Sequence, residues 1–274
     1  MADAIGMPAS GGLLLAMQAA MVPDTSVAGG AWTGPMPSVA LVLRGGMAVL
    51  SLAALVTHVM LPVPVPEQDA HHAQLFIGRW AFLTRHVLCL QMWRQTLSFL
   101  CEAEIQAALV PWGLGFGTGL ESVRAGVVAS TIMIGAMAVF VTVQFFSLVV
   151  PTESYKADAA LWRSKGVPYP EMQELVHIPA GLIAVVDAAV LAPFPAWSAV
   201  SVPRSFVALA LFSLSYCGVL VLSRVVTGYW PYGFMKQLEG VRFVGFVAVQ
   251  VVVVCVFGVL MTGLLWGRDF LLGV

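Results

Sequence analysis

Residues 76–91 read FIGRWAFLTRHVLCLQ, and this stretch decides how the rest of the chain is interpreted. It begins with Arg79 and Trp80, which are residue types that anchor a membrane helix at the lipid–water interface. It continues into an apolar run that, extended to residue 101, is long enough to cross a bilayer. Thr84 places a hydroxyl just inside the entrance of this run. The stretch therefore predicts a membrane helix with a reactive type of side chain near one end.

The composition agrees with a membrane protein. Of the 274 residues, 59% are hydrophobic and 10% are charged, whereas soluble domains carry about 25% charged residues. Mean hydropathy is +0.91. The net charge of −1 gives no reason to expect nucleic-acid binding. The cysteines fall in or beside apolar runs without metal-ligand spacing, so we interpret them as small buried hydrophobic residues: Cys89, Cys101, Cys217 and Cys255.

Six segments have the length and apolar character of a membrane span, about 20 residues each. They cover residues 39–60, 79–101, 123–149, 175–192, 205–226 and 243–266. Proline follows several of them and provides a stop signal. Because backbone groups in lipid must satisfy one another, these runs are helices. The predicted fold is an all-α integral membrane protein, a bundle of about six transmembrane helices.

The domain organisation is simple. Residues 1–37 are rich in Gly, Pro, Ala and Met, and we expect a weakly ordered leader with a possible interfacial helix over 11–22. Residues 38–274 form the six-helix transmembrane domain. Basic residues concentrate on the face that holds the 62–78, 150–174 and 227–242 loops. The positive-inside rule makes this face cytoplasmic and places both termini on the other side. The protein is then a multi-pass membrane protein, in a plasma membrane or an endomembrane.

Thr84 and His177 are the candidate catalytic pair. Thr84 lies five residues past Arg79, about 7.5 Å along a helix, and His177 lies three residues past Glu174, about 4.5 Å. The second and fourth spans run in the same direction, so both side chains enter from one face at a similar depth. A hydroxyl and an imidazole arranged in this way can serve as nucleophile and base. Alternatively, Thr84 bonds to its own backbone and His177 is a structural hydrogen-bonding group.

Arg94 and Asp187 form a second matched pair. Each lies ten residues beyond Thr84 or His177, which places it about 15 Å deeper, near the middle of the bilayer. Because an unpaired charge there costs several kcal/mol, we predict an ion pair between the second and fourth spans. The pair is either structural or the polar floor of a pocket for a substrate head group. Its depth also prevents Asp187 from orienting His177 directly.

A third segment, residues 227–234, reads TGYWPYGF and follows the fifth span. Trp230 and Tyr232 belong to the residue types of an aromatic belt, and the segment lies on the same face as Thr84. It is either a simple membrane anchor or a lid over the mouth of the bundle.

Taken in order, these segments resemble the FAR-17a/AIG1-like family of androgen-induced membrane proteins. Residues 78–84, GRWAFLT, followed by Gln91, resemble the family's G-x-W-x-[FY]-L-T…Q signature. Val176-His177 resembles the second His of its N-H-x-x-H-T segment, and residues 227–232 resemble its T-G-x-W-x-Y-P segment. Asp187 falls where the family tends to place a carboxylate. The resemblance covers residues 70–262.

This resemblance implies a multi-span membrane hydrolase that cleaves fatty acid esters of hydroxy fatty acids. Thr84 would be its nucleophile and His177 its base. Gln91, Trp80, Trp230 and Tyr232, together with Arg94 and Asp187, would line the substrate pocket or support it. Several family positions differ here: the Asn-His pair reads Gln173-Glu174, and the expected Thr, Asp and Pro are Ile178, Val87 and Gly233.

We expect no cofactor, no metal and no nucleic-acid partner; the partners would be the membrane and a lipid substrate from the bilayer. The competing hypothesis is a non-enzymatic lipid-binding or regulatory scaffold. The distance between Thr84 Oγ1 and the nearer His177 nitrogen discriminates between the two. A hydrogen-bonding distance beside a cavity favours the enzyme, and more than about 7 Å, or sealed packing, favours the scaffold. A transporter is disfavoured by the few buried charges and by the lack of paired broken helices.

Overall fold

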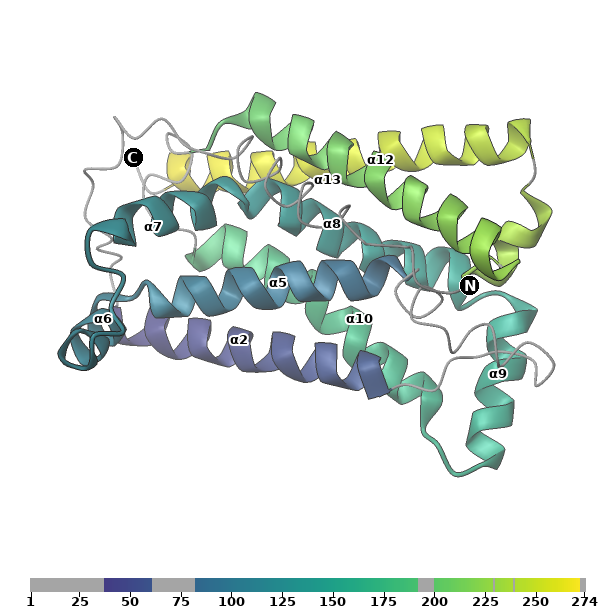
Figure 1. Cartoon of the computed structure of the whole chain (residues 1–274), viewed down its shortest axis with the longest axis horizontal. Helices are drawn as coiled ribbons and strands as arrows, with labels where there is room; N and C mark the ends of the chain where they lie inside the picture. The colour runs from purple at the N-terminus through teal and green to yellow at the C-terminus, as the bar shows by residue number, and fades with distance from the viewer. Residues whose placement is uncertain (1–36, 61–81, 192–199, 229, 239, 272–274) are drawn as a thin grey trace, which may run out of the picture.

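The computed structural model describes residues 37–60, 82–191, 200–228, 230–238 and 240–271, and these residues contain helices and no strand (Figure 1). The long elements are α2 (Pro37–Met60), α5 (Leu83–Leu100), α8 (Thr131–Gln144), α10 (Tyr169–Val186), α12 (Val202–Thr227) and α13 (Val241–Leu271). The shorter helices are α6 (Ala103–Leu109), α7 (Leu120–Ala129) and α9 (Glu153–Ser164). The predicted all-α bundle is confirmed.

Five helical segments are long and apolar enough to cross a membrane: Val39–Met60, Thr131–Val149, Tyr169–Leu191, Val202–Thr227 and Val241–Leu271. The second predicted span corresponds to α5, which is shorter than expected and more polar. It has 18 residues, about 27 Å at 1.5 Å per residue, and lies lengthwise in the bundle with the others (Figure 1). The third predicted span is divided at Ser130, where α7 ends and α8 begins. The leader, residues 1–36, lies outside the described residues.

The centre of the bundle is α8. It packs against α5 and α10 on one side and against α12 and α13 on the other, and its run from Thr131 to Ala138 is fully buried. On the far side of α5 and α10, α2 contacts both of these helices. The result is a three-helix group of α2, α5 and α10 that is joined to α12 and α13 through α8. This group carries half of the buried polar side chains of the described chain.

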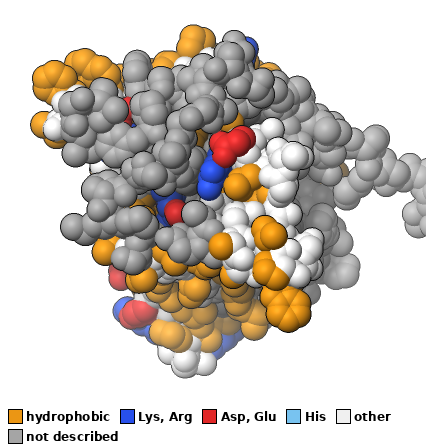
Figure 2. All heavy atoms as spheres, turned by 90° about the vertical axis from the view of Figure 1, so that its left-hand side faces the viewer, with side chains coloured by type: hydrophobic (Ala, Val, Ile, Leu, Met, Phe, Trp, Pro, Cys, Tyr) orange, Lys and Arg blue, Asp and Glu red, His pale blue; other side chains and the backbone are white. Residues whose placement is uncertain are grey.

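The outer surface is apolar. Large hydrophobic side chains are exposed along α2, α12 and α13, among them Val42, Val225, Val241 and Val252. Soluble proteins rarely expose continuous apolar patches of more than a few hundred Å². The end view in Figure 2, taken from the left-hand side of Figure 1, shows hydrophobic and uncharged groups with a few charged side chains in the described part of that face. These exposed helix faces fit contact with lipid.

Two helices end in π-helical turns. α8 continues into a π-helix over Phe145–Val149, and α10 continues into one over Asp187–Leu191. Such turns rotate the side chains that follow and occur frequently at functional sites. One of them carries Phe145 and the other carries Asp187, and both residues belong to the polar arrangements described below.

Candidate active site

The N-terminus of α5 has an unusual cap. Phe82 precedes the helix with an extended backbone and has no side chain that can accept a hydrogen bond from the first turn. The backbone N–H of Leu83 instead points to two phenol oxygens, those of Tyr216 and Tyr232, each 3.0 Å away. Since the first N–H groups of a helix lack partners inside it, the tyrosines fix where α5 begins. This fixes the position of the next residue, Thr84.

Thr84 and His177 meet between α5 and α10. Thr84 Oγ1 lies 3.1 Å from His177 Nε2, and the residues are only 6% and 3% exposed. Thr84 lies in the first turn of α5, whereas α10 begins at Tyr169, eight residues before His177, so α10 starts earlier than the sequence pattern indicated. The structure therefore brings the two candidate catalytic side chains into hydrogen-bonding distance.

Two contacts fix the orientation of the imidazole, and a third holds the backbone that carries it. His177 Nδ1 lies 2.8 Å from the backbone carbonyl of Gln173, and a carbonyl can only accept, so Nδ1 carries the proton and Nε2 is free to accept from Thr84. The Phe145 ring stacks on His177 at 3.7 Å between centroids, with an 8° interplanar angle. The Thr142 hydroxyl donates to the backbone carbonyl oxygen of His177 at 2.7 Å.

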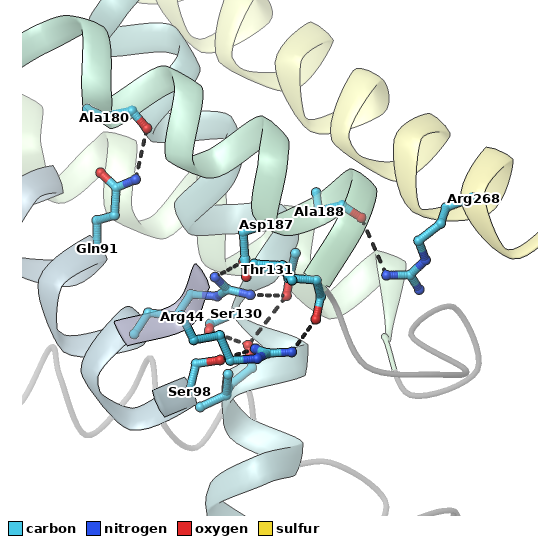
Figure 3. Close-up of polar contacts among 12 residues, drawn as sticks. Arg44, Gln91, Ser98, Ser130, Thr131, Ala180, Asp187, Ala188 and Arg268 are labelled. Carbon is cyan, nitrogen blue, oxygen red and sulfur yellow. Dashed lines mark hydrogen bonds and ion pairs between the residues drawn. The ribbon is translucent and has the colours of Figure 1, made fainter. Parts of the chain in front are cut away.

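The predicted ion pair is present. Arg94 binds the Asp187 carboxylate, and its other terminal nitrogen donates to Thr131 Oγ1 at 2.8 Å (Figure 3). Arg94 is 5% exposed and Asp187 is 1% exposed. The pair lies between α5 and α10, deeper than Thr84 and His177, so Asp187 does not orient the imidazole. That task belongs to the Gln173 carbonyl.

A second buried charge cluster lies beside this ion pair, at the same end of the three-helix group (Figure 3). Arg44 of α2 contacts the Ser98 hydroxyl and the Leu191 carbonyl (Figure 3), and its Nε lies 2.5 Å from Glu102 Oε1. Arg44 is buried and ties α2 to the end of α5 and to the π-helical turn that follows α10.

The other predicted site residues are distributed as follows. Gln91 Nε2 donates to the Ala180 carbonyl at 2.8 Å (Figure 3). This bond links α5 to α10 about two helical turns past Thr84. Trp230 stacks on Phe243 with centroids 5.1 Å apart and has Arg224 over its ring, so it packs where α12 and α13 are joined. Tyr232 reaches the start of α5. Trp80 lies outside the described residues.

Sequence reasoning missed four contributors to the site: Gln173, Phe145, Thr142 and Tyr216. Gln173 had a usable signal, because it precedes His177 by four residues and its carbonyl therefore lies beside that side chain in a helix. Tyr216 had a weaker one, a phenol in the middle of an apolar span. Phe145 and Thr142 had none, because a π-helical turn and a helix crossing place them.

The comparisons with known proteins give one match. The sequence model for the FAR-17a/AIG1-like protein family matches residues 47–265. The search of curated proteins and the search of solved structures each return no match. The matched range begins within α2, ends within α13 and contains every described helix between them. It includes Thr84, His177, Arg94 and Asp187.

Proposed function

The chain belongs to the FAR-17a/AIG1-like family, and from this premise we propose that it is a membrane-embedded hydrolase of lipid esters. Thr84 is its nucleophile and His177 its general base. Fatty acid esters of hydroxy fatty acids are the substrate class that the family resemblance implies. The proposal uses groups of the chain itself and requires no cofactor.

One observation carries the proposal: Thr84 Oγ1 lies 3.1 Å from an imidazole nitrogen whose other ring nitrogen donates to a backbone carbonyl. A threonine hydroxyl is a weak nucleophile until a neighbouring base accepts its proton. A third group must hold that base in the right tautomer, as in hydrolytic triads. The Gln173 carbonyl takes this part here, with Phe145 stacked on the ring.

The chemical steps follow from this arrangement. His177 Nε2 accepts the Thr84 hydroxyl proton as Oγ1 attacks the ester carbonyl carbon, and the carbonyl π electrons become an oxyanion. The tetrahedral species collapses, the alcohol leaves with the proton from His177, and a fatty-acyl ester of Thr84 remains. Water, deprotonated by His177, attacks this ester and releases the fatty acid together with the regenerated threonine.

A long-chain ester suits this location. The exposed faces of α10 beside the site carry Leu175, Ile178 and Leu182, each about half exposed, and an acyl chain can lie along such a face. A water-soluble ester would gain nothing from these apolar surfaces.

The second candidate function is a lipid-binding scaffold without catalysis. The observation that favours it is the close packing of the pair, since Thr84 and His177 are both almost fully buried. In that case their hydrogen bond serves to join α5 to α10, as the hydrogen bond from Gln91 to the Ala180 carbonyl does.

Labelling of the detergent-solubilised protein with a fluorophosphonate probe separates the two functions. Wild type should label, and Thr84→Ala and His177→Ala should not. Thr262→Ala is the matched control, because among the described residues the Thr262 hydroxyl bonds only to its own helix, and its loss should leave labelling unchanged. A folded wild-type protein that does not label would favour the scaffold.

A further inference from the structure

The two phenols at the start of α5 do more than cap the helix. Tyr216, from α12, and Tyr232, from the connection to α13, both lie 3.0 Å from the Leu83 nitrogen, and their oxygens lie 3.3 Å apart. The edge of the Phe82 ring contacts the Tyr232 ring at 5.6 Å between centroids. Two distant segments thus bring hydroxyl groups to the residue that directly precedes Thr84.

The Tyr232 hydroxyl is held only weakly at this point. Its oxygen accepts from the Leu83 N–H, and the Tyr216 oxygen lies 3.3 Å away, whereas O–H···O bonds are usually about 2.7–2.8 Å long. Within the described part of the chain, this long contact is the one that the structure gives to the Tyr232 O–H. A phenol proton held in this way is able to turn toward a stronger acceptor, such as an oxygen that gains negative charge.

We propose that the Tyr232 hydroxyl is the oxyanion donor of the ester hydrolysis, an assignment that rests on the function proposed above. When Thr84 Oγ1 forms its bond to the ester carbon, the carbonyl oxygen gains a negative charge close to Oγ1. Tyr232 O–H donates a hydrogen bond to that oxygen, and the proton stays on the phenol. The bond weakens again when the carbonyl re-forms and the alcohol departs.

Two physical features suit this place to a developing negative charge. The N-terminus of α5 carries the positive end of the helix dipole, and Thr84 lies in its first turn. Burial also raises the pKa of the Tyr232 phenol, so Tyr232 stays protonated at neutral pH. Arg85, the nearest cation along the chain, is directed elsewhere, because its guanidinium binds the side chain and the carbonyl of His58.

The test compares Tyr232→Phe with Tyr216→Phe. Each variant removes one of the two phenols that lie 3.0 Å from the Leu83 nitrogen, so both weaken the helix cap. Loss of an oxyanion donor costs about 10²- to 10³-fold in rate, so Tyr232→Phe should slow fluorophosphonate labelling of Thr84 by that factor. Tyr216→Phe should slow it by less than about tenfold. Melting temperatures in detergent establish that both variants are folded.

A second measurement separates catalysis from a structural role. A long-chain trifluoromethyl ketone forms a tetrahedral adduct that carries an oxyanion, whereas the matching ether does not. Tyr232→Phe should lose affinity for the ketone by at least tenfold and keep its affinity for the ether. Equal loss for both ligands, or labelling within about threefold of wild type, would overturn the assignment.

Site-specific 3-fluorotyrosine at position 232 covers the case in which Tyr232→Phe does not fold, since it keeps both ring and hydroxyl. As a stronger donor it should accelerate labelling, and an unchanged or slower rate argues against the role. The two possible failures are distinguishable. If wild type labels and Tyr232→Phe labels at the same rate, only the oxyanion assignment is removed. Wild type that does not label removes the hydrolase proposal and this role with it.

Discussion

At the scale of single residues, the site depends on how firmly His177 is held. The imidazole is fixed at its edge by the Gln173 carbonyl and on its face by Phe145. A base that is free to rotate spends less time in hydrogen-bonding geometry with Thr84, and the rate of attack falls in proportion. The residues around His177 should therefore affect rate more than they affect stability.

Phe145→Leu tests this directly. Loss of the stacked ring removes about 0.5–1.5 kcal/mol of orienting interaction, so labelling of Thr84 should slow about 2- to 10-fold. Phe270→Leu is the control, because Phe270 is exposed at 74% and its ring contacts Trp266 near the end of α13, so its loss should have no effect. Equal rates for both variants and wild type would show that the stack does not orient the base.

The Arg94–Asp187 pair makes a different prediction. Removing one partner of a buried pair leaves the other charge uncompensated and costs about 3–5 kcal/mol. Arg94→Ala and Asp187→Ala should each lower the free energy of unfolding in detergent by about that amount, and the double variant should lose much less than the sum. Additive losses in this double-mutant cycle would mean that the two residues are not coupled.

At the scale of elements, the crossing of α8 and α10 sets the geometry around His177. These helices approach closely at Gly181, where an added Cβ would lie 2.8 Å from Thr142 Oγ1. Thr142 is β-branched and bonded to the His177 carbonyl, so it cannot move away freely. The crossing therefore couples packing to the position of the base.

Gly181→Ala should destabilise the protein by about 1–3 kcal/mol through overpacking and should slow labelling of Thr84. Gly135→Ala is a matched control in α8, because its added Cβ would meet only the terminal methyl of Met261, at 2.5 Å, and that flexible side chain can turn aside. Thermal unfolding in detergent measures both variants. A smaller loss for Gly181→Ala than for Gly135→Ala would contradict this account of the crossing.

The elements also show what the sequence could and could not predict. Apolar length was sufficient for the helices, because a bilayer requires it. The equal ten-residue spacing was sufficient to match Thr84 with His177 and Arg94 with Asp187. The break at Ser130 and the two π-helical turns were not predictable, since they change the helix phase without changing the apolar pattern. Those turns place Phe145, and long-range contacts place Tyr216 and Tyr232, so the surroundings of the pair could not be predicted.

At the scale of the whole molecule, the topology follows from whether α5 crosses the membrane. Five helical segments meet the length and hydropathy expected of a span, and α5, with its polar face buried against α2 and α10, would be the sixth. Six crossings place both termini on the same side of the membrane. Protease protection of tags at the two ends should give the same result for each, and opposite results would mean an odd number of crossings.

The most direct test of the central claim is to trap the covalent intermediate. The protein is mixed with a long-chain lipid ester, quenched in acid during turnover and digested for mass spectrometry. The account predicts a fatty-acyl group on the peptide that contains Thr84, absent from Thr84→Ala and from His177→Ala. Ester cleavage that persists in Thr84→Ala, or an acyl group on another residue, would contradict it.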